Sequence, residues 1–278
     1  MAFDPAPFAV RRQPRFVGFT ERPHAGMRLY CFPFAGGAAN VYRPWQQLIP
    51  LDVELLACQL PGRHDRMHET PYTDATRLAA RLADDLALEG DDRPFAFFGH
   101  SMGALVAFEL ARELQRRSAP LPTVLGVSGR AAPDSGAHHT TLHLLPSSDL
   151  IRSLSVLGGV PEEVLAIPEL IELMVPVLRA DLELVETYRY VRDGGLLHCP
   201  ITVFGGSVDP MVDAAGLGAW QDCPTRPVVI RVFSGGHFYP WSRPVGEQLI
   251  QVMLTRFRSE RNTVRPTAAS TGGEVASA

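Results

Sequence analysis

The chain contains no lysine, and its cysteines are few and far apart. All 26 basic residues are arginine, and 30 acidic residues leave a formal net charge of −4 at pH 7. This balance offers no basic field for nucleic acid. The four cysteines, Cys31, Cys58, Cys199 and Cys223, form no C-x-x-C zinc pattern. We therefore expect buried free thiols in a reducing cytoplasm.

Long hydrophobic runs are also missing. No segment approaches about 18 uncharged apolar residues, the length that a membrane-spanning helix needs. The N-terminal "MAFDPAPFAVRRQPRF" has no apolar stretch long enough for a signal peptide. The sequence therefore predicts a cytoplasmic protein with no membrane segment. Its 278 residues, of which 46% are hydrophobic, suffice for a large core without a metal or disulfide.

Short apolar runs alternate with helical patterns, which predicts an α/β domain over residues 1–258. Most of the runs are continuously apolar, as in a parallel sheet covered on both faces. The predicted strands are 27–32, 53–58, 94–99, 123–129, 201–206 and 228–233, and the predicted helices are 42–49, 74–89, 102–117, 212–220 and 242–258. Residues 259–278 are small, polar and aperiodic, which predicts a disordered tail.

Residues 133–195 interrupt this alternation, because they contain no strand pattern. In "PEEVLAIPELIELMVPVLRADLELVETYRYV", apolar residues recur at three- and four-residue steps and form one helical face. Pro176 lies inside this pattern and lacks an amide hydrogen, so we expect a kink there. A helical insertion of this size between two strands of the sheet is interpreted as a lid.

A serine stands between two glycines where a predicted strand turns into a helix. The segment "PFAFFGHSMGALVAFELAR" contains the pattern G-x-S-x-G at Gly99, Ser101 and Gly103. This is the nucleophile elbow of α/β-hydrolases, in which a strained turn exposes the serine and leaves room only for small neighbours. The alternative is an ordinary glycine-rich turn. The strand before the pattern and the helix after it favour the elbow.

A nucleophilic serine needs a histidine base that is held by an acid, and in this fold the chain order is serine, acid, histidine. Asp209 follows the predicted strand "ITVFGG", and His237 follows the last predicted strand "VVIRVF". Asp213 is the rival acid, although it resembles part of the next helix. We predict a triad of Ser101, Asp209 and His237.

Hydrolysis also needs two amide donors for the oxyanion that forms at the substrate carbonyl. The residue after the nucleophile, Met102, is predicted to supply one. The glycine-rich segment "CFPFAGGAANVYRPW" follows an early strand, and Ala35 within it is predicted to supply the other. A plain turn is the alternative for this segment.

Several phrases together resemble the type II thioesterases of polyketide and nonribosomal peptide synthesis. They are "FPFAGGAANVYRPW", "QLPGRHDR", "FFGHSMGALVAFELAR", "LGGVPEEVL", "PELIELMVPVLRADLELVETY", "GGSVDPMV" and "FSGGHFYP". The resemblance runs from about Arg28 to Arg256, and the family's triad falls on Ser101, Asp209 and His237. It implies an α/β-hydrolase fold with a mostly parallel sheet flanked by helices.

The resemblance implies a free-standing editing enzyme that hydrolyses stalled or aberrant acyl groups from the phosphopantetheine arm of carrier proteins. Ala35 and Met102 fall on the family's oxyanion donors. The apolar face of the lid, with Met174 and Leu178, and the aromatic Phe238 are expected to contact the acyl chain. We expect an acyl or peptidyl carrier protein as partner, a monomeric state, and no cofactor or metal beyond the phosphopantetheine of the substrate.

Other functions share these features. A carboxylesterase, a lipase or a medium-chain fatty-acyl thioesterase would use the same triad on free substrates. A non-catalytic binding protein would keep the fold but would not need the three residues together. A macrocyclising thioesterase usually ends a multidomain synthase, whereas this chain begins at its own methionine, which favours release by water.

Some polar residues are not assigned to the site. His138, His139 and His143 lack a nearby cysteine or carboxylate cluster, so a loop in solvent is favoured over a metal site. His64 and His68 are expected to be exposed. Arg63 and Arg66 are expected to anchor their loop through backbone hydrogen bonds, with contact to an acidic carrier protein as the alternative.

Overall fold

A single mixed sheet forms the centre of the protein. The computed structural model describes residues 15–135, 141–159 and 166–264. Seven strands pair in the order β1-β3-β2-β4-β5-β6-β7. Only β1 is antiparallel to its neighbour, and all other pairs are parallel. The strands are β1 (Phe16–Gly18), β2 (Met27–Phe32), β3 (Val53–Cys58), β4 (Phe95–His100), β5 (Leu125–Ser128), β6 (Ile201–Gly206) and β7 (Val229–Phe233).

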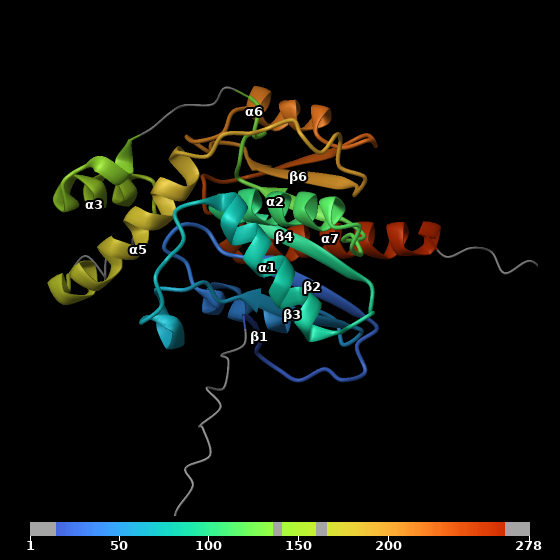
Figure 1. Ribbon diagram of the computed structural model, residues 1–278. Coiled ribbons are helices and arrows are strands. Elements are labelled where there is room, and N and C mark those ends of the chain that lie inside the picture. The colour runs from blue at the N-terminus through green and yellow to red at the C-terminus, as the bar shows by residue number, and fades with distance from the viewer. Residues whose placement is uncertain (1–14, 136–140, 160–165, 265–278) are drawn as a thin grey trace, which may run out of the picture.

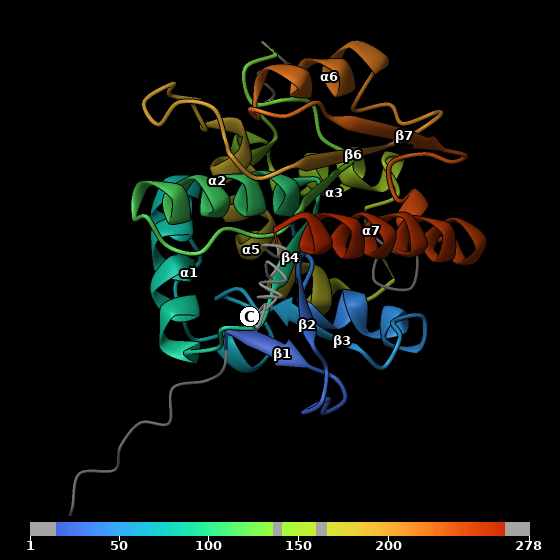
Figure 2. The ribbon, with the colours of Figure 1, turned by 90° about the vertical axis from the view of Figure 1, so that its right-hand side faces the viewer.

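Helices cover both faces of this sheet, as Figures 1 and 2 show. The amphipathic helices α1 (Ala75–Glu89) and α2 (Met102–Arg116) pack on one face, and η1 (Ala39–Gln47) and α7 (Arg243–Val264) pack on the other. Each face therefore has its own hydrophobic layer, which explains why the central strands are mostly apolar on both faces. The predicted fold class, a parallel α/β sheet between two layers of helices, is confirmed.

The remaining helical segments are short or belong to the insertion. They are η2 (His64–Arg66), η3 (Leu142–Leu144), α3 (Ser147–Val156), α5 (Pro168–Glu186), α6 (Ala214–Gly218), η4 (Ala219–Asp222) and η5 (Tyr239–Trp241). None of the helices within the described ranges combines the length and apolarity that a membrane crossing requires. All four cysteines are buried and free, and burial raises the pKa of the Cys223 thiol to about 12.

The insertion between β5 and β6 contains helices and, in its described residues, no strand of the sheet. Figure 1 shows α3 and α5 together to the left of the sheet, beyond one end of its strands. The helix α5 continues through Pro176. Its inner side is buried at Val177, Leu178 and Leu182, whereas Leu173 is 57% exposed. The insertion therefore has the position expected of a lid over one end of the strands.

Several elements differ from the sequence-based expectations, and three of these differences have a clear physical reason. The strand β1 was not predicted, because three residues are too few to show a period. The segment predicted as a helix over 42–49 is instead the 3₁₀-helix η1, which begins at Ala39 and contains Pro44. Helix α7 continues past residue 258 to Val264 because the buried Glu260 pairs with two arginines there. The rest of the predicted tail, residues 265–278, lies outside the described residues.

Candidate active site

Ser101 occupies a strained turn between β4 and α2. Its φ and ψ angles are 55° and −115°, a conformation that L-residues rarely adopt and that costs about 1–3 kcal/mol. The turn is so tight that a Cβ at Gly99 would lie 2.1 Å from the carbonyl oxygen of Gly103. A Cβ at Gly103 would lie 2.0 Å from the carbonyl oxygen of Phe32 in β2. The two glycines therefore allow the close packing that holds Ser101 in this conformation.

Asp209 and His237 meet at the ends of neighbouring strands. Asp209 follows β6, His237 follows β7, and the distance from His237 Nδ1 to Asp209 Oδ2 is 2.9 Å. Both side chains are almost inaccessible, with 3% of His237 and none of Asp209 exposed. The other carboxylate oxygen of Asp209 accepts the amide hydrogen of Met211. A carboxylate on Nδ1 fixes the ring orientation and leaves Nε2 as the atom for proton transfer.

The imidazole of His237 also lies beside the elbow. Its ring centroid is 4.9 Å from that of His100, the residue before Ser101. The hydrogen bonds of the described residues do not include one between the Ser101 hydroxyl and His237. Such catalytic hydrogen bonds often tighten only when substrate binds. The structure thus pairs Asp209 with His237 directly, and brings His237 to the elbow through its packing on His100.

His100 itself is part of the support for this site. Its Nδ1 lies 2.9 Å from the hydroxyl of Ser128, which in turn lies 2.6 Å from the hydroxyl of Tyr239. Burial lowers the pKa of His100 well below its ordinary value, and the nearby His237 lowers it further. A neutral, fully buried imidazole is a packing element of the site.

The rival acid Asp213 lies in a different environment. It is the N-cap of α6, where its Oδ1 accepts the amide hydrogen of Gly216 at 2.7 Å. This is the usual use of an aspartate at the start of a helix. Of the two candidate acids, only Asp209 contacts His237 in the described part of the chain.

Two backbone amides near the serine are available for an oxyanion. Within the described residues, neither the amide of Ala35 nor that of Met102 donates a hydrogen bond. Met102 is the first residue of α2, and amides in the first turn of a helix have no intrahelical acceptor. Residues 33–39, which we call the oxyanion loop, lie against this turn, since a Cβ at Gly103 would be 2.7 Å from the carbonyl oxygen of Pro33.

A buried carboxylate of the lid contacts this loop. The Oδ2 atom of Asp181 in α5 accepts the amide hydrogen of Gly36 at 2.7 Å and also contacts Arg63 Nη1 at 2.7 Å. The sequence analysis did not identify Asp181. A signal was available, because Asp181 stands three residues after Leu178, on the apolar stripe of α5. A charged residue on an apolar face indicates a buried partner.

Arg63 and Arg66 both anchor their loop, as expected. Arg63 donates to the carbonyl oxygens of Gly37 and Pro61, and Arg66 donates to that of Gln59. Both arginines are buried, Arg63 at 8% and Arg66 at 2% exposed. Neither is therefore free to contact an acidic partner at the surface.

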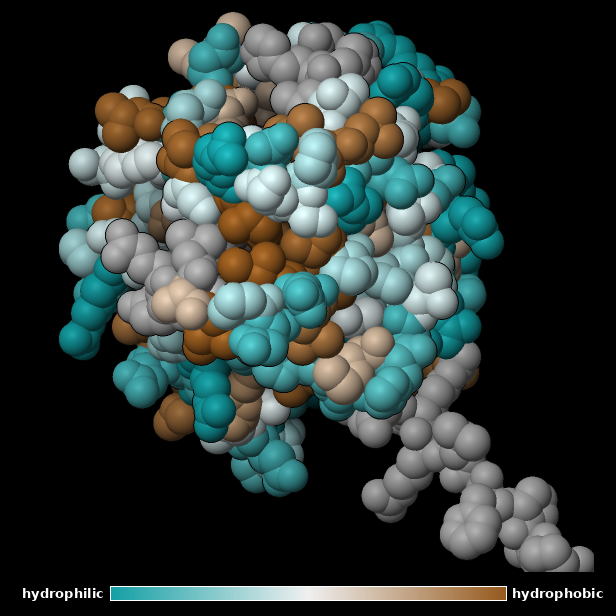
Figure 3. Space-filling view, turned by 90° about the vertical axis from the view of Figure 1, so that its left-hand side faces the viewer, coloured by the Kyte–Doolittle hydropathy of each residue, from teal (hydrophilic) through white to brown (hydrophobic). Residues whose placement is uncertain are grey.

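The three residues expected to contact the acyl chain lie in different environments. Leu178 packs directly on the oxyanion loop, where its Cδ2 would be 2.4 Å from a Cβ at Gly36. The ring of Phe238 lies 5.0 Å from that of Phe34, the residue before Ala35. Met174 is half-buried on α5, one turn before Leu178. Seen from the side that carries the lid, hydrophobic residues gather in a hollow bordered by hydrophilic ones (Figure 3).

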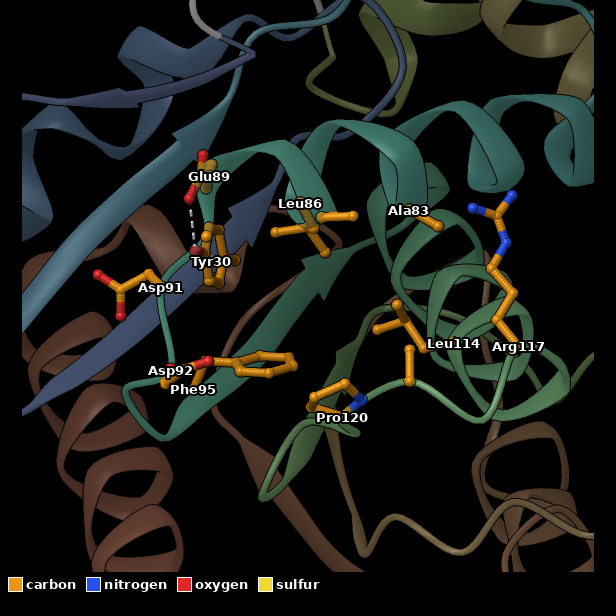
Figure 4. Close-up of a pocket in the computed structure, with 13 residues that line it drawn as sticks. Tyr30, Ala83, Leu86, Glu89, Asp91, Asp92, Phe95, Leu114, Arg117 and Pro120 are labelled. Carbon is orange, nitrogen blue, oxygen red and sulfur yellow. Dashed lines mark hydrogen bonds between the residues drawn. The ribbon is translucent and has the colours of Figure 1, made fainter.

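Two pockets lie on opposite sides of the sheet. One, of about 610 Å³, is lined by His237, by Phe238 and, from the end of α3, by Leu157 and Gly158. The other, of about 250 Å³, lies between α1, α2 and the start of β4, with Phe95, Leu86 and Leu114 in its wall (Figure 4). Because Ser101 follows the end of β4, the second pocket is remote from the nucleophile. The first pocket is therefore the one that belongs to the candidate active site.

The histidines outside the site show no metal-binding arrangement in the residues that the structure describes. His64 and His68 are exposed, as expected. His143 contacts Glu186, whose carboxylate also accepts the amide hydrogens of Leu142 and His143. No group of three or more histidine, cysteine or acidic residues within these ranges could hold a metal ion. His138 and His139 lie outside the described residues.

Comparison with known proteins gives a consistent picture. Residues 27–255 match the thioesterase domain family. The chain is 37% identical over 243 residues to the gramicidin S biosynthesis protein GrsT of Aneurinibacillus migulanus, which covers 87% of this chain and 93% of GrsT. The structure of the type II thioesterase BorB from the borrelidin biosynthetic cluster superposes with a TM-score of 0.78 at 37% identity, covering 87% of this chain and 97% of BorB. The medium-chain S-acyl fatty acid synthase thioesterase of Homo sapiens is 32% identical over 252 residues, covering 88% of this chain and 92% of that enzyme.

Proposed function

The chain belongs to the thioesterase domain family, and on this premise we propose that it is an editing enzyme of polyketide or nonribosomal peptide biosynthesis. Its substrates are aberrant or stalled acyl groups on the phosphopantetheine arm of carrier proteins, which it releases by hydrolysis. The similarity to GrsT and BorB supports this substrate class. The observation that carries the chemistry is the contact of His237 with Asp209 beside a serine elbow.

Ser101 is the nucleophile in this proposal. His237 Nε2 takes the hydroxyl proton as the serine oxygen attacks the thioester carbon, while Asp209 orients the ring and stabilises its protonated form. The free amides of Ala35 and Met102 donate to the oxyanion of the tetrahedral intermediate. Each such donor contributes about 3 kcal/mol to transition-state stabilisation.

The intermediate collapses by expelling the pantetheine thiol, which receives the proton from His237 and leaves an acyl-serine. A water molecule, deprotonated by the same histidine, then attacks the acyl carbon and releases the acid. A thiol is a better leaving group than an amine, so the first half of the cycle needs little acid assistance. All of these steps use side chains and amides of the chain itself, and the proposal includes no cofactor or metal.

The acyl chain is held between the lid and the two loops of the site. Leu178 and Phe238 both pack on the oxyanion loop, the first at Gly36 and the second at Phe34. Met174 continues the apolar side of α5. We include all three in the acyl-binding surface. Their apolar side chains would favour acyl groups that remove hydrophobic area from water.

The proposal extends to partner and location. A carrier protein delivers the substrate, the enzyme acts as a monomer, and it works in the cytoplasm. The four free thiols support a reducing compartment.

The second candidate is a thioesterase that acts on free acyl substrates, and the similarity to the human medium-chain enzyme favours keeping it. The two functions differ in whether the carrier protein contributes to recognition. The test compares kcat/KM for an acyl group on its carrier protein with kcat/KM for the same acyl group on N-acetylcysteamine. Editing of carriers predicts at least a tenfold preference for the carrier-bound substrate, whereas equal efficiencies would support the second candidate.

The same assay tests the nucleophile. Ser101→Ala should lower turnover roughly 10⁴-fold or more on both substrates. Ser153→Ala on the lid helix α3 serves as the control, because its hydroxyl donates only to the carbonyl oxygen of Asp149. Unchanged turnover in Ser101→Ala would rule out the proposed mechanism.

A further inference from the structure

A buried ion pair joins the lid to the loop after β3, and both of its members contact the oxyanion loop. The guanidinium of Arg63 and the carboxylate of Asp181 form two parallel contacts, Nη1 to Oδ2 and Nη2 to Oδ1, each 2.7 Å long. Arg63 is 8% exposed and Asp181 is 2% exposed. The two residues are 118 positions apart in the chain, and one of them belongs to α5. The pair is thus a tertiary contact rather than a local one.

The carboxylate has a third contact, with the backbone of the oxyanion loop. Asp181 Oδ2 accepts the amide hydrogen of Gly36 at 2.7 Å. Gly36 has a φ angle of 78° in a turn closed by the bond from the Gly37 amide to the Phe34 carbonyl. This is the conformation of the third residue in a type II turn. If the peptide between Ala35 and Gly36 rotated, a carbonyl oxygen would face the carboxylate, so Asp181 selects one orientation of that peptide.

Side chains from the next loop hold the rest of the oxyanion loop. Arg63 Nη1 donates to the carbonyl oxygen of Gly37 at 2.9 Å. Gln59 Oε1 accepts the amide hydrogen of Ala39 at 3.2 Å, and Gln59 Nε2 donates to the carbonyl oxygen of Arg63. Backbone groups at Gly36, Gly37 and Ala39 are therefore all fixed by buried side chains. Among the residues that the structure describes, the amide of Ala35, inside the same turn, has no acceptor.

Stability alone does not account for this arrangement. A buried ion pair contributes little net stability, because desolvation of both charges opposes their attraction, and well-packed apolar residues often do as well. An apolar pair at 63 and 181 could fill the same volume. It could not accept the hydrogen of Gly36 or donate to the oxygen of Gly37. What the charged pair adds is control over the orientation of the loop peptides.

We propose that Asp181 and Arg63 are positioning residues that hold the oxyanion loop in its active conformation from the lid. This inference rests on the proposed function, since it assigns the network a role in that reaction. It makes α5 more than a cover for the acyl chain. Leu178 of this helix contacts the substrate. One turn later, Asp181 of the same helix supports the loop that carries the Ala35 donor.

Four variants separate an effect on the orientation of the loop peptides from an effect on the stability of the protein. Asp181→Ala removes the acceptor, and Asp181→Asn keeps an oxygen for the Gly36 amide but removes the charge. The double variant Arg63→Met, Asp181→Leu removes the acceptor and restores apolar packing. Glu109→Gln is the matched control, because Glu109 is a buried partner of Arg112 outside the oxyanion loop.

Four quantities are measured for each variant: the melting temperature, kcat and KM for an acyl-N-acetylcysteamine, and the exchange rate of the Gly36 amide hydrogen. Asp181→Ala should lower kcat about 100-fold, as loss of one oxyanion donor does, with KM within about threefold of the original. Gly36 exchange should become at least tenfold faster. Asp181→Asn should retain most of kcat and of the amide protection.

The double variant is decisive. We expect it to recover the melting temperature that Asp181→Ala loses, while kcat stays about 100-fold low and Gly36 exchange stays fast. Recovery of kcat together with the melting temperature would overturn the inference, as would a kcat loss in Glu109→Gln equal to that in Asp181→Ala. If the unmodified protein does not hydrolyse acyl thioesters, the proposed function fails instead, and the exchange rates still report whether Asp181 holds the loop.

Discussion

The sheet and the lid are built in different ways. The turns that carry Ser101 and Asp209 continue directly from buried strands and are closed by backbone hydrogen bonds, such as those from Ser101 to Ser128 and from Ser207 to Phe233. The lid helices instead leave large apolar residues in water, with Leu173 57% and Val156 84% exposed. The sheet therefore fixes the reacting groups, and the lid is a separate, less completely packed layer.

Polar side chains make up much of the lid's attachment to the rest of the protein. Asp181 pairs with Arg63, and Tyr188, just after α5, donates to the buried Glu109 of α2. Such contacts depend on geometry more than apolar packing does. We therefore expect changes at the strand ends to alter the chemistry itself. Changes on the apolar face of the lid should alter which substrates react, whereas Asp181 is the lid residue whose loss should lower kcat.

The largest effect is expected at the strand ends. Asp209→Asn should lower kcat roughly 10⁴-fold, because the amide no longer stabilises the required tautomer and the protonated form of His237. Asp213→Asn, the matched control four residues away, should leave kcat within about threefold, because asparagine also caps helices well. Steady-state hydrolysis of one acyl thioester measures both. Equal losses of kcat in the two variants would mean that the contact with His237 does not identify Asp209 as the acid of the triad.

A smaller and different effect is expected from the lid. Met174→Ala should change the ratio of kcat/KM between a long and a short acyl thioester by about tenfold, since each lost methylene contact is worth about 1 kcal/mol or more. The value of kcat for the shortest substrate should change little. Leu173→Ala, at the exposed neighbouring position, is the control. If both variants shift the ratio equally, the apolar face of α5 does not contact the acyl chain.

The smallest effect is expected in the helical layer beneath the site. Asp74 caps α1 by accepting the amide hydrogens of Thr76 and Arg77. Asp74→Ala should lower the free energy of unfolding by about 1 kcal/mol and leave kcat unchanged. Urea unfolding at pH 7 measures the first quantity, and the thioester assay measures the second.

The capping contribution should also depend on pH. The Arg77 amide, the Thr76 hydroxyl and the Thr76 amide hold the pKa of Asp74 below its ordinary value. The stabilisation is therefore fully present above the unfolded carboxyl pKa of about 3.9, and it is lost as the pH falls through the lower folded pKa. The difference in stability between Asp74→Ala and the unmodified protein should shrink below about pH 4. A constant difference down to pH 2 would contradict this assignment.

Secondary structure could be predicted best from the sequence where all residues of a segment are buried in the same way. The strands at 27–32, 53–58 and 201–206 coincide with β2, β3 and β6, because each is mostly apolar on both faces. The edge strand β1 has no such run. The 3₁₀ form of η1, with Pro44 inside it, depends on packing against β3 and could not be distinguished from an α-helix by its apolar pattern.

The candidate site likewise contains residues that the sequence predicts and residues whose contacts depend on the tertiary structure. Ser101, Asp209 and His237 could be predicted together because each follows a recognisable strand. Asp181 could not be paired with Gly36, which is 145 residues away, since nothing local to either residue indicates that α5 folds over the oxyanion loop. Likewise, the anchoring role of Arg63 could be predicted, but its contact with the carbonyl oxygen of Gly37, 26 residues away, could not, because only the tertiary structure brings the two together.

The two glycines of the elbow have a consequence for how this enzyme can diversify. They lie where a strand, a helix and a neighbouring strand are in backbone contact, so a single added methyl group would push whole segments apart rather than reshape one side chain. Variation of acyl preference, whether in evolution or in a mutant library, is therefore confined to positions around the serine. A library directed at new substrates should keep residues 99–103 and Asp181 constant and place its diversity at the other inward-facing positions of α5.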